Sequence, residues 1–193
     1  MILAGIILAE AAGIYDGKNV VQTQSYGVEA RGGASRAEVI ISDEEIVFPE
    51  VTHPDILLAM NQPSVDKFLS SLKPGGVLIV DSSQVKKLPA TEARAYWIPM
   101  TDLGKKAGAV IVSNIVALGS LVGLTGVVSE EAIRKAVLGR IPKGTEALNQ
   151  RALELGLQAA QEAKKERMIR ISPRPFERRF SWRSVQSRVP PGP

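Results

Sequence analysis

Hydrophobic residues fall along this chain in short runs of the kind that form strands. Residues 77–80, Val-Leu-Ile-Val, form a near-continuous apolar stretch directly after two glycines. Such a run is typical of a parallel strand covered on both faces, whereas strict alternation indicates a strand with one solvated face. Comparable runs predict further strands at residues 19–24, 37–42, 96–99 and 109–112.

Segments with helical spacing of apolar residues separate these runs. They predict helices at residues 2–13, 63–72, 113–124, 149–166 and in a segment that starts at Ser129. Two of these starts have a capping residue, since Asn61 precedes Pro63 and Ser129 precedes two glutamates. Thr101 is the expected cap of one more helix, after the strand at 96–99.

The order of these elements predicts an α/β protein. Alternating strands and helices give a Rossmann-like, three-layer domain with a mostly parallel sheet, which we assign to residues 1–166. Aromatic residues make up only 5% of the chain, so its core must be aliphatic. Gly119 and Gly123 form a G-x-x-x-G pattern, for which we expect tight packing between helices.

One uncharged stretch is long enough to raise the question of a membrane span. Residues 107–128 carry no charge, and about 20 apolar residues suffice to cross a bilayer. Ser113, Asn114, Ser120 and Thr125 interrupt this stretch, as do several glycines. We therefore expect a buried helix, a protein without membrane association and a cytoplasmic location.

The net charge of +4 comes from the end of the chain. From Lys165 onward there are eight Lys or Arg residues against two Glu, so the preceding 164 residues carry a net charge of −2. The folded part is thus mildly acidic, and we expect no nucleic-acid binding by it. Residues 167–193 combine arginines, prolines and aromatic residues. This basic tail is either a disordered extension, which we favour, or a segment that binds an anionic surface.

The residue types present exclude several kinds of chemistry. The chain has no cysteine, so it offers no thiolate for an iron–sulfur cluster or for nucleophilic catalysis. His53 is its one histidine, which leaves no clustered histidine metal site. We therefore expect no metal site and no catalytic residue on this chain.

A glycine- and arginine-rich loop between the two expected strands at 19–24 and 37–42 has the strongest functional signal. Glycines allow another molecule to approach the backbone closely, and arginine presents a planar fork to phosphate or carboxylate. The loop is expected to contact an anion or another protein, although a simple connection with solvated charges would have a similar composition. Its candidate contact residues are Tyr26, Gly27, Arg31, Gly32, Gly33 and Arg36.

A second group of polar residues follows apolar runs. Asp81 and Ser82 come at the carboxyl end of the strand at 77–80, the edge where open α/β sheets usually bind ligands. Asn61 and Gln62 follow another apolar stretch. Ligand contact is one interpretation of these four residues; helix capping and turn formation explain them equally well.

The glycine- and arginine-rich loop also carries a family resemblance. Residues 25–27 and 29–33 (Ser-Tyr-Gly, Glu-Ala-Arg-Gly-Gly) resemble the signature of the gamma subunit of 2-oxoacid:ferredoxin oxidoreductases, although Val28 stands where that family usually has proline. The similarity continues in order through residues 55–63, 72–82, 114–119 and 141–143. Ordered blocks over most of the chain are far more specific than any single motif.

The resemblance implies a role in CoA-dependent oxidative decarboxylation of a 2-oxoacid, with electrons passed to ferredoxin. It implies alpha and beta subunits that carry thiamine diphosphate and Mg²⁺, and a ferredoxin-like delta subunit that carries the iron–sulfur clusters. No cofactor would be bound by this chain alone. Arg31 and Arg36 would meet CoA phosphates or an acidic partner, the glycines would permit close approach, and Tyr26 would pack at the interface. The oxoacid, whether pyruvate, 2-oxoglutarate or a branched-chain oxoacid, stays open.

The resemblance also implies a strand and a glycine-rich turn before the first helix, and neither occurs in this sequence. Their absence is expected to leave a hydrophobic gap in the sheet with an exposed edge. Two other interpretations stay open. One is a free-standing Rossmann-like module that binds a nucleotide at the Asp81 strand end, and the other is an inactive truncated product.

Overall fold

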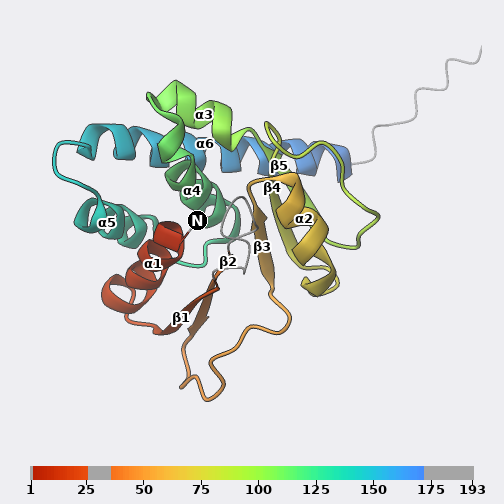
Figure 1. The fold of residues 1–193 in the computed structure, drawn as a ribbon, viewed down its shortest axis with the longest axis horizontal. Helices are drawn as coiled ribbons and strands as arrows, with labels where there is room; N and C mark the ends of the chain where they lie inside the picture. The colour runs from red at the N-terminus through yellow and green to blue at the C-terminus, as the bar shows by residue number, and fades with distance from the viewer. Residues whose placement is uncertain (1, 26–35, 172–193) are drawn as a thin grey trace, which may run out of the picture.

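The computed structural model describes residues 2–25 and 36–171 and has five strands in this part of the chain, in two separate sheets (Figure 1). β1 (Asn19–Ser25) and β2 (Arg36–Ser42) form an antiparallel pair, in register from Asn19 opposite Ser42 to Ser25 opposite Arg36. The segment that joins them, residues 26–35, holds most of the glycine- and arginine-rich loop and lies outside the described residues.

The second sheet is parallel, with β4 (Val77–Asp81) between β3 (Ile56–Ala59) and β5 (Arg94–Ile98). β4 is buried on both faces, as its continuous apolar run predicts. Leu78 and Val80 pack in a small core under α2, whereas Ile79 belongs to the main core on the opposite face.

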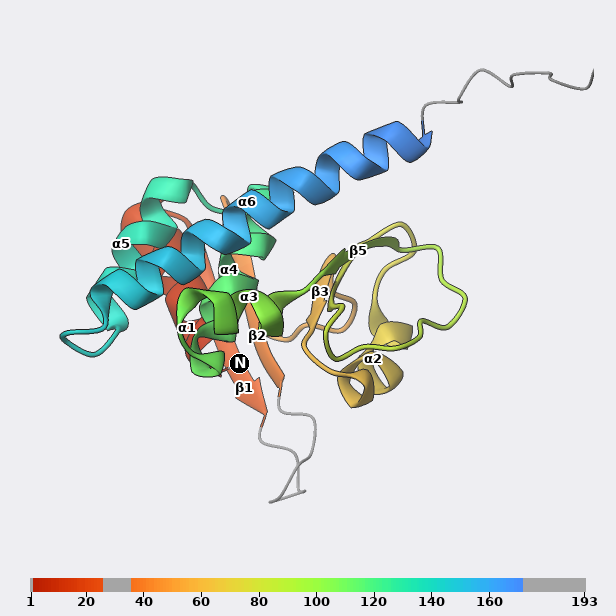
Figure 2. The ribbon, with the colours of Figure 1, turned by 90° about the horizontal axis from the view of Figure 1, so that it is seen from above.

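Helices pack on both faces of the parallel sheet and against the antiparallel pair. They are α1 (Ile2–Glu10), continued by the π-helical η1 (Ala11–Tyr15), α2 (Gln62–Phe68) with the 3-10 turn η2 (Leu69–Ser71), α3 (Met100–Ala107), the 3-10 turn η3 (Val110–Val112), α4 (Ser113–Thr125), α5 (Glu130–Arg140) and α6 (Glu146–Ile171). Figure 2 shows α6 crossing over α4 and running past β5. None of the helices in the described part of the chain has the length and apolar content needed to span a bilayer.

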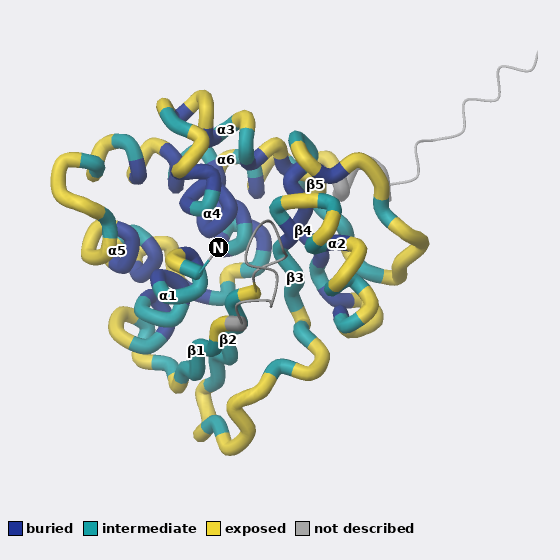
Figure 3. Tube along the Cα trace, in the orientation of Figure 1, coloured by how far each residue is buried: buried dark blue, intermediate teal, exposed yellow. Residues whose placement is uncertain are grey.

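The main core lies where α4 meets α6, and Figure 3 shows α4 as the most continuously buried helix. Gly119 and Gly123 of α4 allow this contact, because a side chain on either would strike α6. Gly156 makes the matching approach from α6, and the Ser120 hydroxyl donates to the Val116 carbonyl 2.9 Å away. Tight helix packing, as the G-x-x-x-G pattern predicts, is confirmed.

Two of the three predicted caps, Asn61 and Ser129, are confirmed. The Asn61 side chain accepts a hydrogen bond from Ser64 N at 2.9 Å, and the Ser129 hydroxyl accepts one from Ala132 N at 3.1 Å. Ser129 also donates through its backbone and its hydroxyl to the Asp16 carboxylate, both at 2.7 Å. The start of α5 is thereby tied to the turn that follows η1.

Several sequence predictions differ from the structure. The strand expected at 109–112 is the turn η3, because only a few residues separate the end of α3 from the start of α4. Thr101 is not a cap, since α3 begins one residue earlier, at Met100. β3 was not predicted at all. The first helix and the last also run past their expected ends, to Tyr15 and Ile171.

The α/β class is confirmed. Among the described residues, β2 pairs with β1 alone and β3 pairs with β4 alone. The facing edges of β2 and β3 are therefore not joined by the described strands. A cavity of the described part of the chain lies at this place.

Candidate functional site

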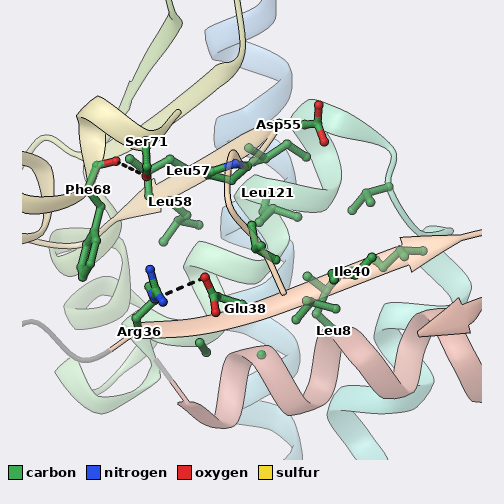
Figure 4. Close-up of a pocket in the computed structure, with 18 of the residues that line it drawn as sticks. Leu8, Arg36, Glu38, Ile40, Asp55, Leu57, Leu58, Phe68, Ser71 and Leu121 are labelled. Atoms are coloured by element: carbon green, nitrogen blue, oxygen red, sulfur yellow. Dashed lines mark hydrogen bonds and ion pairs between the residues drawn. The ribbon is translucent and has the colours of Figure 1, made fainter. Parts of the chain in front are cut away.

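A cavity of about 710 Å³ separates the two sheets (Figure 4). One side is β2, through residues 36–41, and the other is β3, through residues 56–58. α1 and α4 contribute its apolar lining, namely Ala4, Gly5, Leu8, Leu118 and Leu121. Residues from α2 and from the segment before β3 complete the lining, and they include Phe48, His53, Asn61, Ser64 and Phe68.

Arg36 is the one described member of the predicted loop site, and it lies at this cavity. Its Nε is 3.3 Å from the Glu38 carboxylate, and its guanidinium carbon lies 5.7 Å from the centre of the Phe68 ring. Figure 4 shows the Arg36 and Glu38 side chains meeting at one end of the cavity. Arg36 thus holds a fixed position through an ion pair and a cation–π contact.

A second ion pair lines the same cavity. Lys73 Nζ lies 2.7 Å from the Asp55 carboxylate, just before β3 begins. Both cations therefore already have an acidic partner, and an anion that enters must compete with a carboxylate for either one. His53, for which the sequence indicated no role, is exposed and lies in the cavity wall.

Of the two predicted amides, Asn61 reaches the cavity and Gln62 has a structural role. Asn61 lines the cavity while its Oδ1 caps α2. Gln62 Oε1 accepts from Lys86 N at 3.0 Å and Lys87 N at 3.2 Å, and its Nε2 donates to the Lys87 carbonyl at 3.1 Å and to Asp66 Oδ1 at 2.8 Å. Gln62 therefore fixes the segment after β4 against α2.

Asp81 is fully buried and is used as an anchor for α3. Its carboxylate accepts hydrogen bonds from Ser83 N at 2.9 Å, from Thr101 N at 3.0 Å and from the Thr101 hydroxyl. Ser82 donates its backbone N–H to the Ile98 carbonyl at 2.9 Å. These bonds agree with the capping and turn-forming interpretation of the two residues. They engage the polar groups at the strand end where the nucleotide-binding interpretation places its ligand.

Next to this anchor, Asp102 on α3 is exposed and paired with Lys105 at 2.9 Å. The pKa of Asp102 lies below its ordinary value because Lys105 donates a hydrogen bond to the carboxylate and Ser83 adds another. No group of three or more metal-ligating side chains occurs among the residues that the structure describes.

The structure thus brings only some of the described predicted site residues together. Arg36 and Asn61 line the cavity between the sheets. Asp81 anchors α3, Ser82 bonds to the end of β5, and Gln62 holds the segment after β4, all outside the cavity lining. Sequence reasoning missed the cavity because β3 was not recognised, although an apolar run, Ile-Leu-Leu-Ala, stands between Pro54 and Asn61. It also missed Phe68 and the Lys73–Asp55 pair.

A three-stranded parallel sheet between helices, with an antiparallel pair beside it, defines an α/β protein. Comparison with known proteins gives the particular family. The chain matches the family described as pyruvate ferredoxin/flavodoxin oxidoreductase over residues 1–159, and it belongs to that family.

Three similar proteins define the position of the chain within the family. The 2-oxoglutarate synthase subunit KorC of Methanocaldococcus jannaschii is 49% identical over 165 residues, which cover 84% of this chain and 88% of that protein. The crystal structure of the keto/oxoacid ferredoxin oxidoreductase gamma subunit from Geobacter sulfurreducens is 52% identical, with a TM-score of 0.76 over 84% of this chain and 92% of that one.

The third similar protein is a much longer chain. It is the 2-oxoglutarate:ferredoxin oxidoreductase from Magnetococcus marinus with 2-oxoglutarate, coenzyme A and succinyl-CoA bound. The identity is 25% and the TM-score 0.71, over 83% of this chain and 28% of that one. The chain is accordingly a gamma-type subunit of a 2-oxoacid:ferredoxin oxidoreductase, which makes it one part of a multi-subunit oxidoreductase.

Proposed function

We propose that this gamma subunit serves a cytoplasmic enzyme that oxidatively decarboxylates 2-oxoglutarate, transfers the acyl group to CoA and passes the electrons to ferredoxin. The observation that carries the proposal is the 49% identity, over most of both chains, to a subunit named for 2-oxoglutarate synthase. In this proposal the alpha and beta subunits hold thiamine diphosphate and Mg²⁺, and a ferredoxin-like delta subunit holds the iron–sulfur clusters.

This chain would contribute contacts and no cofactor of its own. Tyr26, Gly27, Arg31, Gly32 and Gly33 would form a contact surface for CoA or for a partner subunit, next to Arg36. The position of Arg36 supports this assignment, because its partly exposed guanidinium stands where the loop joins β2. A CoA phosphate would replace Glu38 as its partner, and guanidinium–phosphate pairs are strong, often bidentate contacts.

The substrate is tested with the assembled enzyme. The chain is used to capture its partners from the native cytoplasm, and the captured material is assayed for CoA-dependent reduction of a viologen dye. With 2-oxoglutarate, pyruvate and 2-oxoisovalerate supplied in parallel, 2-oxoglutarate should be the preferred substrate. Recovery of an active complex that prefers another oxoacid would correct the substrate, and an inactive lone chain would contradict the proposal.

The contact surface is tested in the same complex with Arg31→Ala and Arg36→Ala. Loss of one charged hydrogen bond costs roughly 1.5–3 kcal/mol, which corresponds to an increase of about 10- to 150-fold in the KM for CoA or to a comparable weakening of assembly. Arg134→Ala is the matched control, since Arg134 is a half-exposed arginine held by Glu130 and Glu154 on another face. An unchanged KM together with unchanged assembly would refute the role of both arginines.

A further inference from the structure

Three polar side chains lie on one face of the antiparallel pair. In the register of β1 and β2, Thr23 stands opposite Glu38, and Arg36 precedes Glu38 by two residues. All three therefore point to the same side of the pair. The Thr23 hydroxyl donates to Glu38 Oε2 at 3.2 Å, and Arg36 Nε lies 3.3 Å from Glu38 Oε1. Both oxygens of the Glu38 carboxylate are thus engaged.

The two members of the Arg36–Glu38 pair differ in exposure. The Glu38 side chain keeps 15% of its surface exposed, and the Arg36 side chain keeps 42%. Within the described part of the chain, Arg36 is the one cation that forms an ion pair with Glu38. A carboxylate that is mostly out of water depends strongly on its counter-charge, because burial of an unpaired charge is costly. Glu38 therefore resists the loss of Arg36 to another anion.

Arg36 has a second contact that does not involve Glu38. Its guanidinium carbon lies 5.7 Å from the centre of the Phe68 ring, and Figure 4 shows Phe68 and Glu38 on either side of it. Lys67 Nζ lies 5.6 Å from the same ring centre and has no ion pair with a described residue. An Arg36 side chain released by Glu38 would therefore keep its aromatic contact, beside a second positive charge.

An anion that binds Arg36 meets the charge of Glu38 in either of two arrangements. It can take the place of Glu38, which leaves that carboxylate without its cation. It can also bind the remaining N–H groups of the guanidinium with Glu38 still in place, which brings two negative charges close together. Both arrangements cost free energy, and in both the cost comes from the charge of Glu38 rather than from its size.

We propose that Glu38 is a positioning residue that acts through Arg36 and keeps the affinity for CoA moderate. It holds the guanidinium in place before CoA arrives, and its charge opposes the phosphate that Arg36 binds. This inference rests on the proposed function, in which Arg36 meets a phosphate of CoA. CoA and the acyl-CoA product carry the same phosphates, so Glu38 weakens the binding of both and favours release of the product.

The test is Glu38→Gln in the assembled enzyme, because glutamine has nearly the same size, can still accept the Thr23 hydrogen bond and carries no charge. The KM for CoA should fall by about 2- to 10-fold, as expected when one competing, partly exposed ion pair is removed. The inhibition constant of the acyl-CoA product should fall by the same factor, since the phosphate end is common to both molecules. Loss of folded enzyme would lower the rate at saturation and would move neither constant.

Dephospho-CoA identifies the phosphate concerned, because it lacks the phosphomonoester of CoA and keeps the diphosphate. If Arg36 meets the diphosphate, Glu38→Gln should lower the KM for dephospho-CoA as well. If Arg36 meets the phosphomonoester, the KM for dephospho-CoA should stay the same while the KM for CoA falls. The opposing role of Glu38 is supported in both cases.

Two further variants show whether Glu38 acts through Arg36. Glu154→Gln is the matched control, since it removes a carboxylate from the ion pair with Arg134 between α5 and α6 and should leave both constants unchanged. In an Arg36→Ala background, Glu38→Gln should no longer lower the KM for CoA. If Arg36→Ala raises this KM but Glu38→Gln alone leaves it unchanged or raises it, the inference is wrong and the proposed CoA contact stands. If Arg36→Ala has no effect, both are wrong.

Discussion

Adding a methyl group at the crossing of α4 and α6 is the sharpest test of how this domain is held together. In Gly156→Ala, the new Cβ would lie 2.9 Å from Ser120 N and 3.0 Å from Gly119 Cα, and closer still to the Val116 carbonyl oxygen. All three are backbone atoms of α4, so no side-chain rotation relieves the clash. The two helices must move apart along the most buried contact of the main core.

The magnitude follows from two opposing terms. Overpacking a well-filled core costs typically 1–3 kcal/mol, and contact with backbone places this site at the upper end of that range. Replacing glycine by alanine in a helix returns about 1 kcal/mol. The net loss is therefore about 2 kcal/mol, which lowers the melting temperature by roughly 4–8 °C in a protein of this size.

Gly139→Ala is the matched control within the same chain. Gly139 is an exposed residue of α5, and its new Cβ would meet only the Tyr15 hydroxyl, at 3.6 Å. That is an ordinary contact, so this variant should gain about 0.5–1 kcal/mol from helix propensity. Thermal unfolding followed by circular dichroism measures both variants. A melting temperature for Gly156→Ala at or above that of the unmodified chain would refute the packing argument.

Two further predictions concern polar contacts. Asp81→Asn should lower the free energy of unfolding by about 1–3 kcal/mol, because an amide cannot accept all the hydrogen bonds from Ser83 and Thr101; an unchanged midpoint in urea would contradict this. The pKa of Glu131 lies below its ordinary value, because Lys135 donates a hydrogen bond to it and attracts its charge. The pair therefore stabilises the fold fully above the unfolded pKa of about 4.3, and this contribution is lost as the pH falls through the lower folded pKa. Lys135→Gln should reduce that small acid sensitivity in melting curves at about pH 3–6, and identical pH profiles would contradict the pairing.

Local signals in the sequence predict a good part of this fold. The apolar run of β4 predicts a strand buried on both faces, and Asn61 and Ser129 predict the starts of α2 and α5. Each cap bonds to a backbone N–H only three residues further along the chain. The strand is recognised from the burial of its apolar residues alone. The helical spacing of apolar residues predicts most of α6 for the same reason, and Leu153 and Leu157 on it are buried.

The errors arise where distant contacts or short connections decide the structure. Val110 and Ile111 favour a strand by composition, yet Gly108 ends α3 with φ 139° and Ser113 already begins α4, so only a tight turn fits between them. The start of α3 is capped by Asp81, about twenty residues earlier in the chain, which no local pattern at Thr101 reveals.

The same limit applies to the candidate site. Arg36 is recognisable from its loop, but the cavity it lines depends on the spatial meeting of β2, β3, α1 and α4, which are far apart in sequence. β3 has four residues, near the lower limit for a strand, and Leu and Ala within it favour helix as much as sheet. The gap expected in the sheet could not be placed between β2 and β3, because β3 was not predicted.

The interrupted sheet has a mechanical consequence. A continuous sheet resists bending because hydrogen bonds tie every strand to the next, and in the described residues that series stops at β2 and resumes at β3. Load between the two halves must pass through side chains packed on α1 and α4 and through the connecting segment 43–55. The domain is therefore most compliant along this one line. Deformation should therefore be greatest along this line and least at the close-packed crossing of α4 and α6.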